Sequence, residues 1–152
     1  MRCQVPLAVL GLLTAITIPA CAASPDNTIP DQQSIMALET KISQAQPREQ
    51  CFLYAELMHQ MTEVSLRQYA AGDVEHANQL LVRIQELAHK MHLTVSSDDK
   101  RLKNAEILLR RTALRLSEML HSRSYEDRPL VEETLAQVNK AETEAMMQVF
   151  RK

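Results

Sequence analysis

Pairs of glutamate and histidine at one spacing are the side chains of this sequence best suited to chemistry. In each pair the histidine follows the glutamate by three positions: Glu56 and His59, Glu86 and His89, and Glu118 and His121. Because residues three apart share one face of a helix, each pair would present a carboxylate and an imidazole side by side. Both groups bind transition metals. The spacing therefore raises a metal-binding hypothesis.

Three methionines lie near two of these histidines in the sequence: Met58 and Met61 near His59, and Met91 near His89. Thioether and imidazole ligands suit copper(I), which an exported protein can meet. One hypothesis is therefore a periplasmic protein that binds copper or another transition metal. Its candidate metal ligands are His59, His89, His92, Glu56 and Glu86.

The hydrophobic pattern offers a structural alternative for the same residues. Met61 and Met91 belong to apolar helix faces, and methionine readily fills the core of a bundle. The second and third pairs fall on the polar side of their helices. A di-iron site in a bundle needs carboxylates that point inward from four helices, and we expect no buried glutamate here. The pairs would then lie on the surface and stabilise their helices slightly.

The cysteines predict packing rather than catalysis. The chain has three, Cys3, Cys21 and Cys51, and the first two fall in the N-terminal segment described below. Cys51 would then be alone in the mature chain, as a buried thiol or an intermolecular bridge. Cys51 and His59 fall on different faces of one helix, so they do not form a nucleophile and base pair. With no inward pair of carboxylates for acid–base chemistry, the sequence predicts that the protein is not an enzyme.

The N-terminal segment predicts export. Arg2 supplies a positive charge, and residues 5–18 form a mainly apolar run that Pro19 ends. The run is shorter than a membrane span of about 20 residues, and small residues follow it. Residues 1–22 are therefore predicted to be a secretory signal peptide that is cleaved after Ala22.

An alternative cleavage would place a lipid on the protein. Residues 18–21 resemble a bacterial lipobox, so Cys21 would become a lipidated first residue. Residues 23–30 are rich in turn-forming residues and predict a flexible tether. We expect the protein to be periplasmic or secreted, with contact to a membrane only through such an anchor at Cys21.

Composition narrows the function classes. Of 152 residues, 45% are hydrophobic and 24% are charged, as in an ordinary globular domain. The net charge of −2 and the aromatic content of 3% give no support for nucleic-acid binding. The two glycines, Gly11 and Gly72, cannot build a phosphate-binding loop.

Helical periodicity recurs along the rest of the chain. The apolar residues of five expected helices span Asp31–Ala45, Arg48–Ala71, Ala77–Met91, Leu102–Met119 and Val131–Val149. The second is apolar on two sides, which is typical of a central helix. The fourth carries a coiled-coil seam with alternate spacings of three and four. Pro47, Gly72 and Asp73 stand where helices should start or stop.

These elements predict an all-α, antiparallel up-and-down helical bundle. It has four long helices and a short leading helix, in a single domain over residues 31–152. Because the connections are short, consecutive helices are expected to be antiparallel neighbours. The fourth helix is rich in Lys and Arg and the fifth in Asp and Glu, so we expect ion pairs between them to select their pairing.

Two functions remain open from the sequence. The first is a non-enzymatic exported protein that works by contact with a protein partner, or with itself, in the cell envelope. The helix that carries Cys51 and Phe52 is the expected contact face. Alternatively Arg110, Arg111 and Arg115 would face a partner or anionic lipid headgroups. The second is the metal-binding protein described above.

Overall fold

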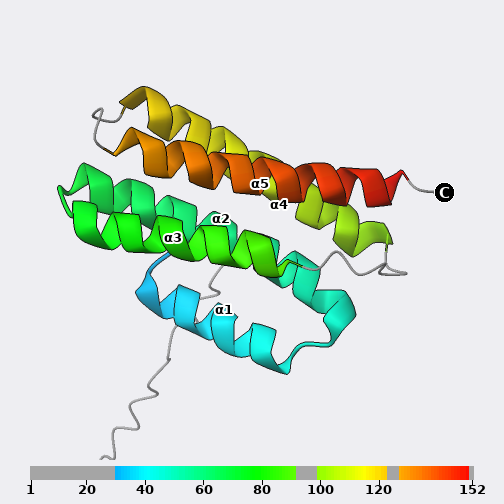
Figure 1. Cartoon of the computed structure of the whole chain (residues 1–152). Helices are drawn as coiled ribbons and strands as arrows, with labels where there is room; N and C mark the ends of the chain where they lie inside the picture. The colour runs from blue at the N-terminus through cyan, green and yellow to red at the C-terminus, as the bar shows by residue number, and fades with distance from the viewer. Residues whose placement is uncertain (1–29, 92–98, 123–126, 151–152) are drawn as a thin grey trace, which may run out of the picture.

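The computed structural model describes residues 30–91, 99–122 and 127–150, which form five helices and no strand (Figure 1). The helices are α1 (Gln32–Gln44), α2 (Pro47–Ala70), α3 (Val74–Lys90), α4 (Asp99–Ser122) and α5 (Arg128–Val149). This confirms the predicted all-α bundle and its short leading helix. The predicted signal peptide (1–22) with Cys21, residues 23–29 of the predicted tether, and His92 lie outside the described residues.

Local sequence signals set the helix ends as expected. Gly72 has a φ of 81° directly after α2, in the left-handed region that glycine adopts without steric cost. The Asp73 carboxylate accepts a hydrogen bond from the backbone N–H of His76 and caps α3. Pro47 occupies the first turn of α2, where its missing N–H costs nothing.

The predicted apolar faces form the core. Both apolar sides of α2 are buried, with Leu53, Leu57 and Met61 on one and Cys51, Ala55 and Met58 on the other. The α4 seam is buried too: Leu102, Ala105, Leu109, Thr112, Leu116 and Met119. Met61 and Met91 are core residues, with 0% and 4% of their surface exposed. As expected for a central helix, α2 packs against α1, α3 and α4.

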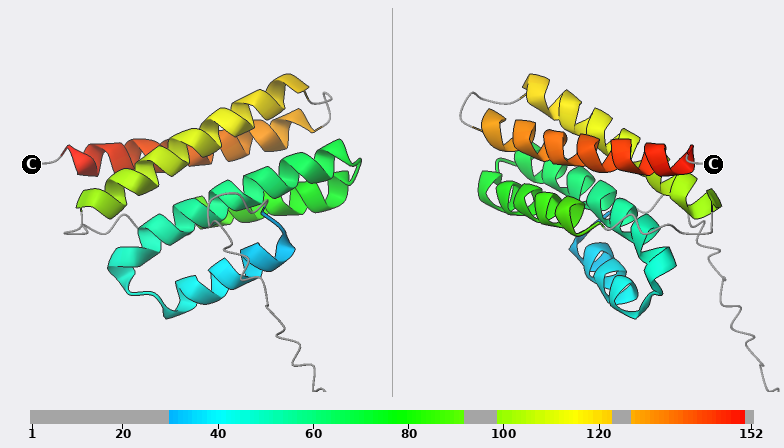
Figure 2. Two further views of the ribbon diagram at one scale, coloured as in Figure 1. Left: turned by 180° about the vertical axis from the view of Figure 1, so that it is seen from behind. Right: turned by 45° about the vertical axis from the view of Figure 1, so that its right-hand side comes forward.

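The four long helices form two antiparallel hairpins that pack side by side, α2 with α3 and α4 with α5. The second hairpin lies on the first so that α2 packs against α4 and α3 against α5. Two ion pairs, Glu49–Arg101 and Glu63–Arg115, join α2 to α4. From the first pair to the second, the residue number rises on both helices. The α2–α4 pair is therefore parallel, as Figure 2 shows from behind.

One detail of the expected arrangement is wrong. α3 and α4 were expected to be antiparallel neighbours, but their described residues make no close backbone contact. A short connection limits the distance between two helix ends without deciding which helices pack along their length. α2 packs against α4 as well as α3, and α5 lies between α3 and α4 on the other side, so α4 is placed diagonally from α3.

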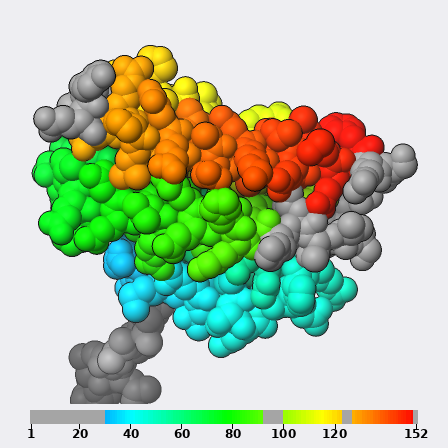
Figure 3. Space-filling view, viewed as in Figure 1, coloured from blue at the N-terminus to red at the C-terminus, as the bar shows by residue number. Residues whose placement is uncertain are grey.

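α1 lies outside this four-helix arrangement and packs against α2. Ile35, Leu38 and Ile42 are buried there, and Glu39 forms an ion pair with Arg83 of α3. In Figure 3, α5 lies above α3 and α1 lies below α3. No helix of the described segments is long and apolar enough to cross a membrane.

Candidate functional site

The first predicted metal pair lies on α2, beside α4. Glu56 and His59 are both half-buried, and the His59 Nδ1 atom lies 3.3 Å from the Thr112 Oγ1 atom. The Thr112 hydroxyl donates to the Leu108 carbonyl oxygen at 2.8 Å. It can therefore only accept from His59, which assigns the proton of the neutral imidazole to Nδ1. Burial lowers the pKa of His59 below its ordinary value of 6.5.

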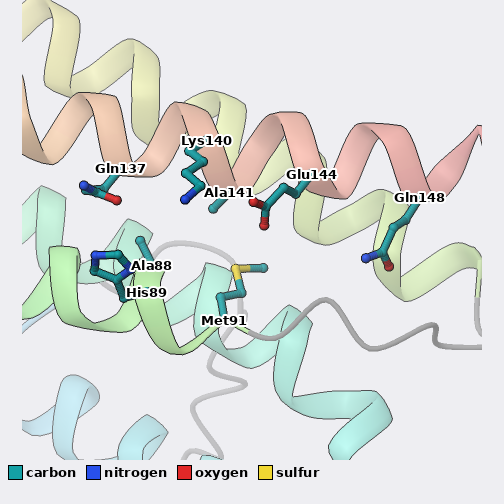
Figure 4. A pocket seen from close by; sticks show the side chains of 8 residues that line it. All are labelled: Ala88, His89, Met91, Gln137, Lys140, Ala141, Glu144 and Gln148. Carbon is teal, nitrogen blue, oxygen red and sulfur yellow. The ribbon is translucent and has the colours of Figure 1, made fainter.

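The second predicted pair lies on α3 and is exposed, as expected for Glu86 and His89. His89 and Met91 line a cavity of about 300 Å³ between the end of α3 and α5. Lys140 and Glu144 of α5 line the same cavity, and Figure 4 shows the Met91 sulfur on the side of Glu144. One predicted histidine, one methionine and one carboxylate are thus brought to one place, together with a cation.

The third pair, Glu118 and His121, forms hydrogen bonds within α4. Glu118 accepts a hydrogen bond from Arg115 at 2.7 Å, and the His121 Nδ1 atom lies 2.7 Å from the Ser117 carbonyl oxygen, to which it donates. Both Glu118 and His121 are exposed, as expected.

The structure does not gather the predicted metal ligands into one site. His59 faces α4, whereas His89 lies beside α5, because α2 and α3 pack against different helices of the second hairpin. Within residues 30–91, 99–122 and 127–150, no three His, Cys, Asp or Glu side chains form a group that could hold a metal ion.

Acidic residues of α2, rather than α5 alone, pair with the basic helix α4. Arg115 binds Glu63 with two nitrogen atoms, at 2.7 and 3.1 Å, and Arg101 binds Glu49 at 2.8 Å. The expected contact with α5 is made by Arg110, which lies 3.5 Å from Glu142. The expectation that charge pairs α4 with α5 is therefore incomplete, since the parallel packing of α2 offers other carboxylates.

The burial of Glu106 contradicts another expectation. No buried glutamate was expected, yet Glu106 on α4 is only 8% exposed and forms an ion pair with Arg110. Arg110 follows it by four positions, so a pairing signal was present in the sequence. Arg110 also lies 3.5 Å from Glu142 of α5, so the Glu106 side of α4 faces α5.

Cys51 and most apolar residues of its helix are covered by neighbouring helices. Cys51 is 7% exposed, and burial raises the pKa of its thiol to about 11. Phe52 is half-buried and packs against the core. The α2 surface was expected to be the contact face, but α1, α3 and α4 pack against this helix and bury most of its apolar residues within the chain.

Two of the exposed large apolar side chains of the described residues lie on the outward side of α4. Ile107 and Leu114 are 41% and 60% exposed, and Lys103 and Arg111 are exposed beside them. At 100° per residue these four lie opposite the buried seam. We call Lys103, Ile107, Arg111 and Leu114 the outer α4 face. Their spacing of four, four and three could have been found in the sequence, as a second stripe on the same helix.

The arginines of α4 differ in whether they form ion pairs. Arg110 and Arg115 form ion pairs, but Arg111 and Lys103 form none within the described residues. The outer α4 face therefore combines two unneutralised cations with two exposed apolar side chains.

Comparison with known proteins assigns no family to this chain: no family model, no curated protein and no solved structure matches it.

Proposed function

We propose that this chain is a non-enzymatic exported protein that works by protein–protein contact in the cell envelope, through the outer α4 face. The observation that carries the proposal is the exposure of Ile107 and Leu114 next to Arg111. Export is supported by the charged and apolar pattern of residues 1–22.

The chemistry of the outer α4 face favours an acidic amphipathic helix as the partner. Ile107, Arg111 and Leu114 have the i, i+4, i+7 spacing by which one helix contacts another. Apolar side chains of the partner would cover Ile107 and Leu114, and its carboxylates would neutralise Arg111 and Lys103.

Site-specific photo-crosslinking in the native cell tests this proposal. The photoreactive residue p-benzoylphenylalanine is placed at Leu114 and, as a matched control, at Met36 of α1, which is equally exposed at 60%. We expect a discrete crosslinked protein from position 114 and none from position 36. The further change Arg111→Glu should abolish the crosslink, because it introduces repulsion against an acidic partner.

Three results would overturn the assignment of the partner. Equal crosslinking from positions 36 and 114 would show non-specific contact. A product of twice the chain mass would show self-association, and a crosslink to lipid would show that the outer α4 face lies against a membrane.

The cavity between α3 and α5 supports a second candidate function, the binding of a transition metal. His89, Met91 and Glu144 line it, and these ligand types suit copper or a related ion. Lys140 in the same cavity opposes a cation, which is why we place this function second.

A native mass spectrum of the protein made with its own signal tests both export and metal binding. The mass shows cleavage after Ala22 or a lipid on Cys21. After exposure to copper(I), zinc and iron(II), one retained ion per chain would support the second function. Since His59 and His89 lie at different places, the single variants His59→Ala and His89→Ala separate them, and loss with His89→Ala alone would locate the ion in the α3–α5 cavity.

A further inference from the structure

A second cavity lies at the opposite pair of helices, where α2 and α4 begin and α1 ends. It has a volume of about 450 Å³. Because α2 and α4 are parallel, both start at this end of the bundle, next to the end of α1 (Figure 2). Neither the outer α4 face nor the predicted metal residues contribute to its lining.

The lining of this cavity is strongly cationic. Lys41 of α1 and Lys100 and Arg101 of α4 line it, and Glu49 is the one acidic residue among the lining residues that the structure describes. Glu49 binds Arg101 at 2.8 Å, whereas Lys41 and Lys100 form no ion pair within the described residues. Among these described lining residues the cations exceed the carboxylates by two charges. The positive ends of the α2 and α4 dipoles lie at this end of the bundle, and the negative end of the α1 dipole partly offsets them.

An apolar surface completes the cavity. Phe52 and Leu53 of α2 line it beside the cations, and Asn104 adds a neutral polar group. Leu53 is buried and Phe52 half-buried, so both are held in place by the core. An anion with an attached apolar group could contact the ammonium groups and the Phe52 ring together.

We propose that this cavity binds a phosphate-bearing amphiphile, with Lys41 and Lys100 contacting the phosphate and Phe52 contacting the apolar group. A phosphate monoester carries nearly two negative charges at neutral pH, which matches the excess of two cations in the lining. Lysine binds phosphate as a point charge and needs no fixed fork geometry. This inference is independent of the proposed contact through the outer α4 face.

Titration calorimetry of the full chain with hexyl phosphate tests the proposal. We expect saturable binding that weakens as salt is added, weaker binding of inorganic phosphate, and none of hexanol. Lys41→Gln and Lys100→Gln should each weaken binding about tenfold, as for the loss of a charged hydrogen bond. Lys140→Gln makes the same charge change at the other cavity and should leave the affinity unchanged.

The variant Glu49→Gln should change the affinity for hexyl phosphate in the opposite direction. It removes a carboxylate of the lining that would repel a phosphate, so hexyl phosphate should bind more tightly. A merely structural role for these residues does not predict weaker binding in two variants and tighter binding in the third. Circular dichroism of each variant checks that the helices are retained.

Vesicles that contain phosphatidic acid distinguish a lipid from a soluble ligand. Retention on these vesicles that hexyl phosphate competes away would assign the phosphate to a lipid headgroup, and binding of hexyl phosphate without retention would assign it to a soluble amphiphile. Both results support the site. No saturable binding of hexyl phosphate, or equal affinity in Lys41→Gln, Lys100→Gln and Lys140→Gln, would overturn it.

Discussion

Glu63 on α2 and Arg115 on α4 join the two hairpins by a two-point ion pair. The Arg115 Nε and Nη2 atoms lie 2.7 and 3.1 Å from the two Glu63 carboxylate oxygens. This fork geometry fixes orientation as well as distance. The hydrogen bond from Arg115 holds the pKa of Glu63 below its ordinary value of 4.5.

Glu63→Gln should therefore lower the free energy of unfolding by about 1 kcal/mol at neutral pH, a modest value because both side chains are partly exposed. Since the folded pKa is lowered, the stabilisation is full above pH 4.5 and is lost as the pH falls through that lowered pKa. Urea unfolding of both proteins from pH 7 to pH 3 measures this. A difference that stays constant over this range would contradict the assignment. Glu132→Gln is the control, since Glu132 pairs with Arg128 within α5 and joins no two helices.

Two histidines should titrate on opposite sides of pH 6.5. Burial lowers the pKa of His59, and the hydrogen bond to the Asp73 carboxylate raises the pKa of His76. His59 then contributes stability that is full above pH 6.5 and is lost as the pH falls through its folded pKa. His76 contributes stability that is present below pH 6.5 and is lost as the pH rises through its folded pKa.

Imidazole NMR titration measures both midpoints in one experiment. Asp73→Asn should return the His76 midpoint toward 6.5 and leave the His59 midpoint in place. A His59 midpoint at or above that of His76 would show that His59 is not buried against α4.

The Cys51 thiol should be inert in the folded protein. Burial raises its pKa to about 11, so almost no thiolate forms at pH 8. In a chain with Cys3→Ser and Cys21→Ser, reaction with a disulfide reagent at pH 8 should be slow in buffer and fast in denaturant. Rapid reaction without denaturant would instead mark Cys51 as an accessible nucleophile and reopen the question of catalysis.

Two leucines of α4 should separate stability from binding. Leu109 is 0% exposed and Leu114 is 60% exposed. Leu109→Ala should lower the free energy of unfolding by about 3 kcal/mol, through lost burial and the cavity left behind. Leu114→Ala should change it by less than about 0.5 kcal/mol, yet it should weaken contact with the partner. Urea unfolding and the crosslinking assay read the two effects separately.

Much of the fold could be predicted from the sequence because the signals are local. A period of 3.6 residues identified the buried apolar positions of all five helices, but not buried polar residues such as Glu106 and Thr134. The turn at Gly72 and Asp73 depends on backbone freedom and side-chain capping within a few residues. Burial of Cys51 followed from the same periodicity.

The tertiary structure decided which faces meet. An apolar stripe predicts that a helix face is buried, but it does not predict which helix will cover that face. Only the tertiary structure shows that α4 lies parallel to α2 and diagonally from α3. That packing directs Arg115 to Glu63 rather than to α5 and buries Glu106. It also places His59 and His89 beside different helices.

The candidate sites also depend partly on local sequence and partly on tertiary packing. The sequence by itself determined that α4 has a basic outward side, because helical spacing sets which of its residues share a face. Only the tertiary structure brought Lys41, Phe52 and Lys100, from three helices, to one cavity. Contacts between residues far apart in the chain depend on how hairpins stack, and no local pattern encodes that choice.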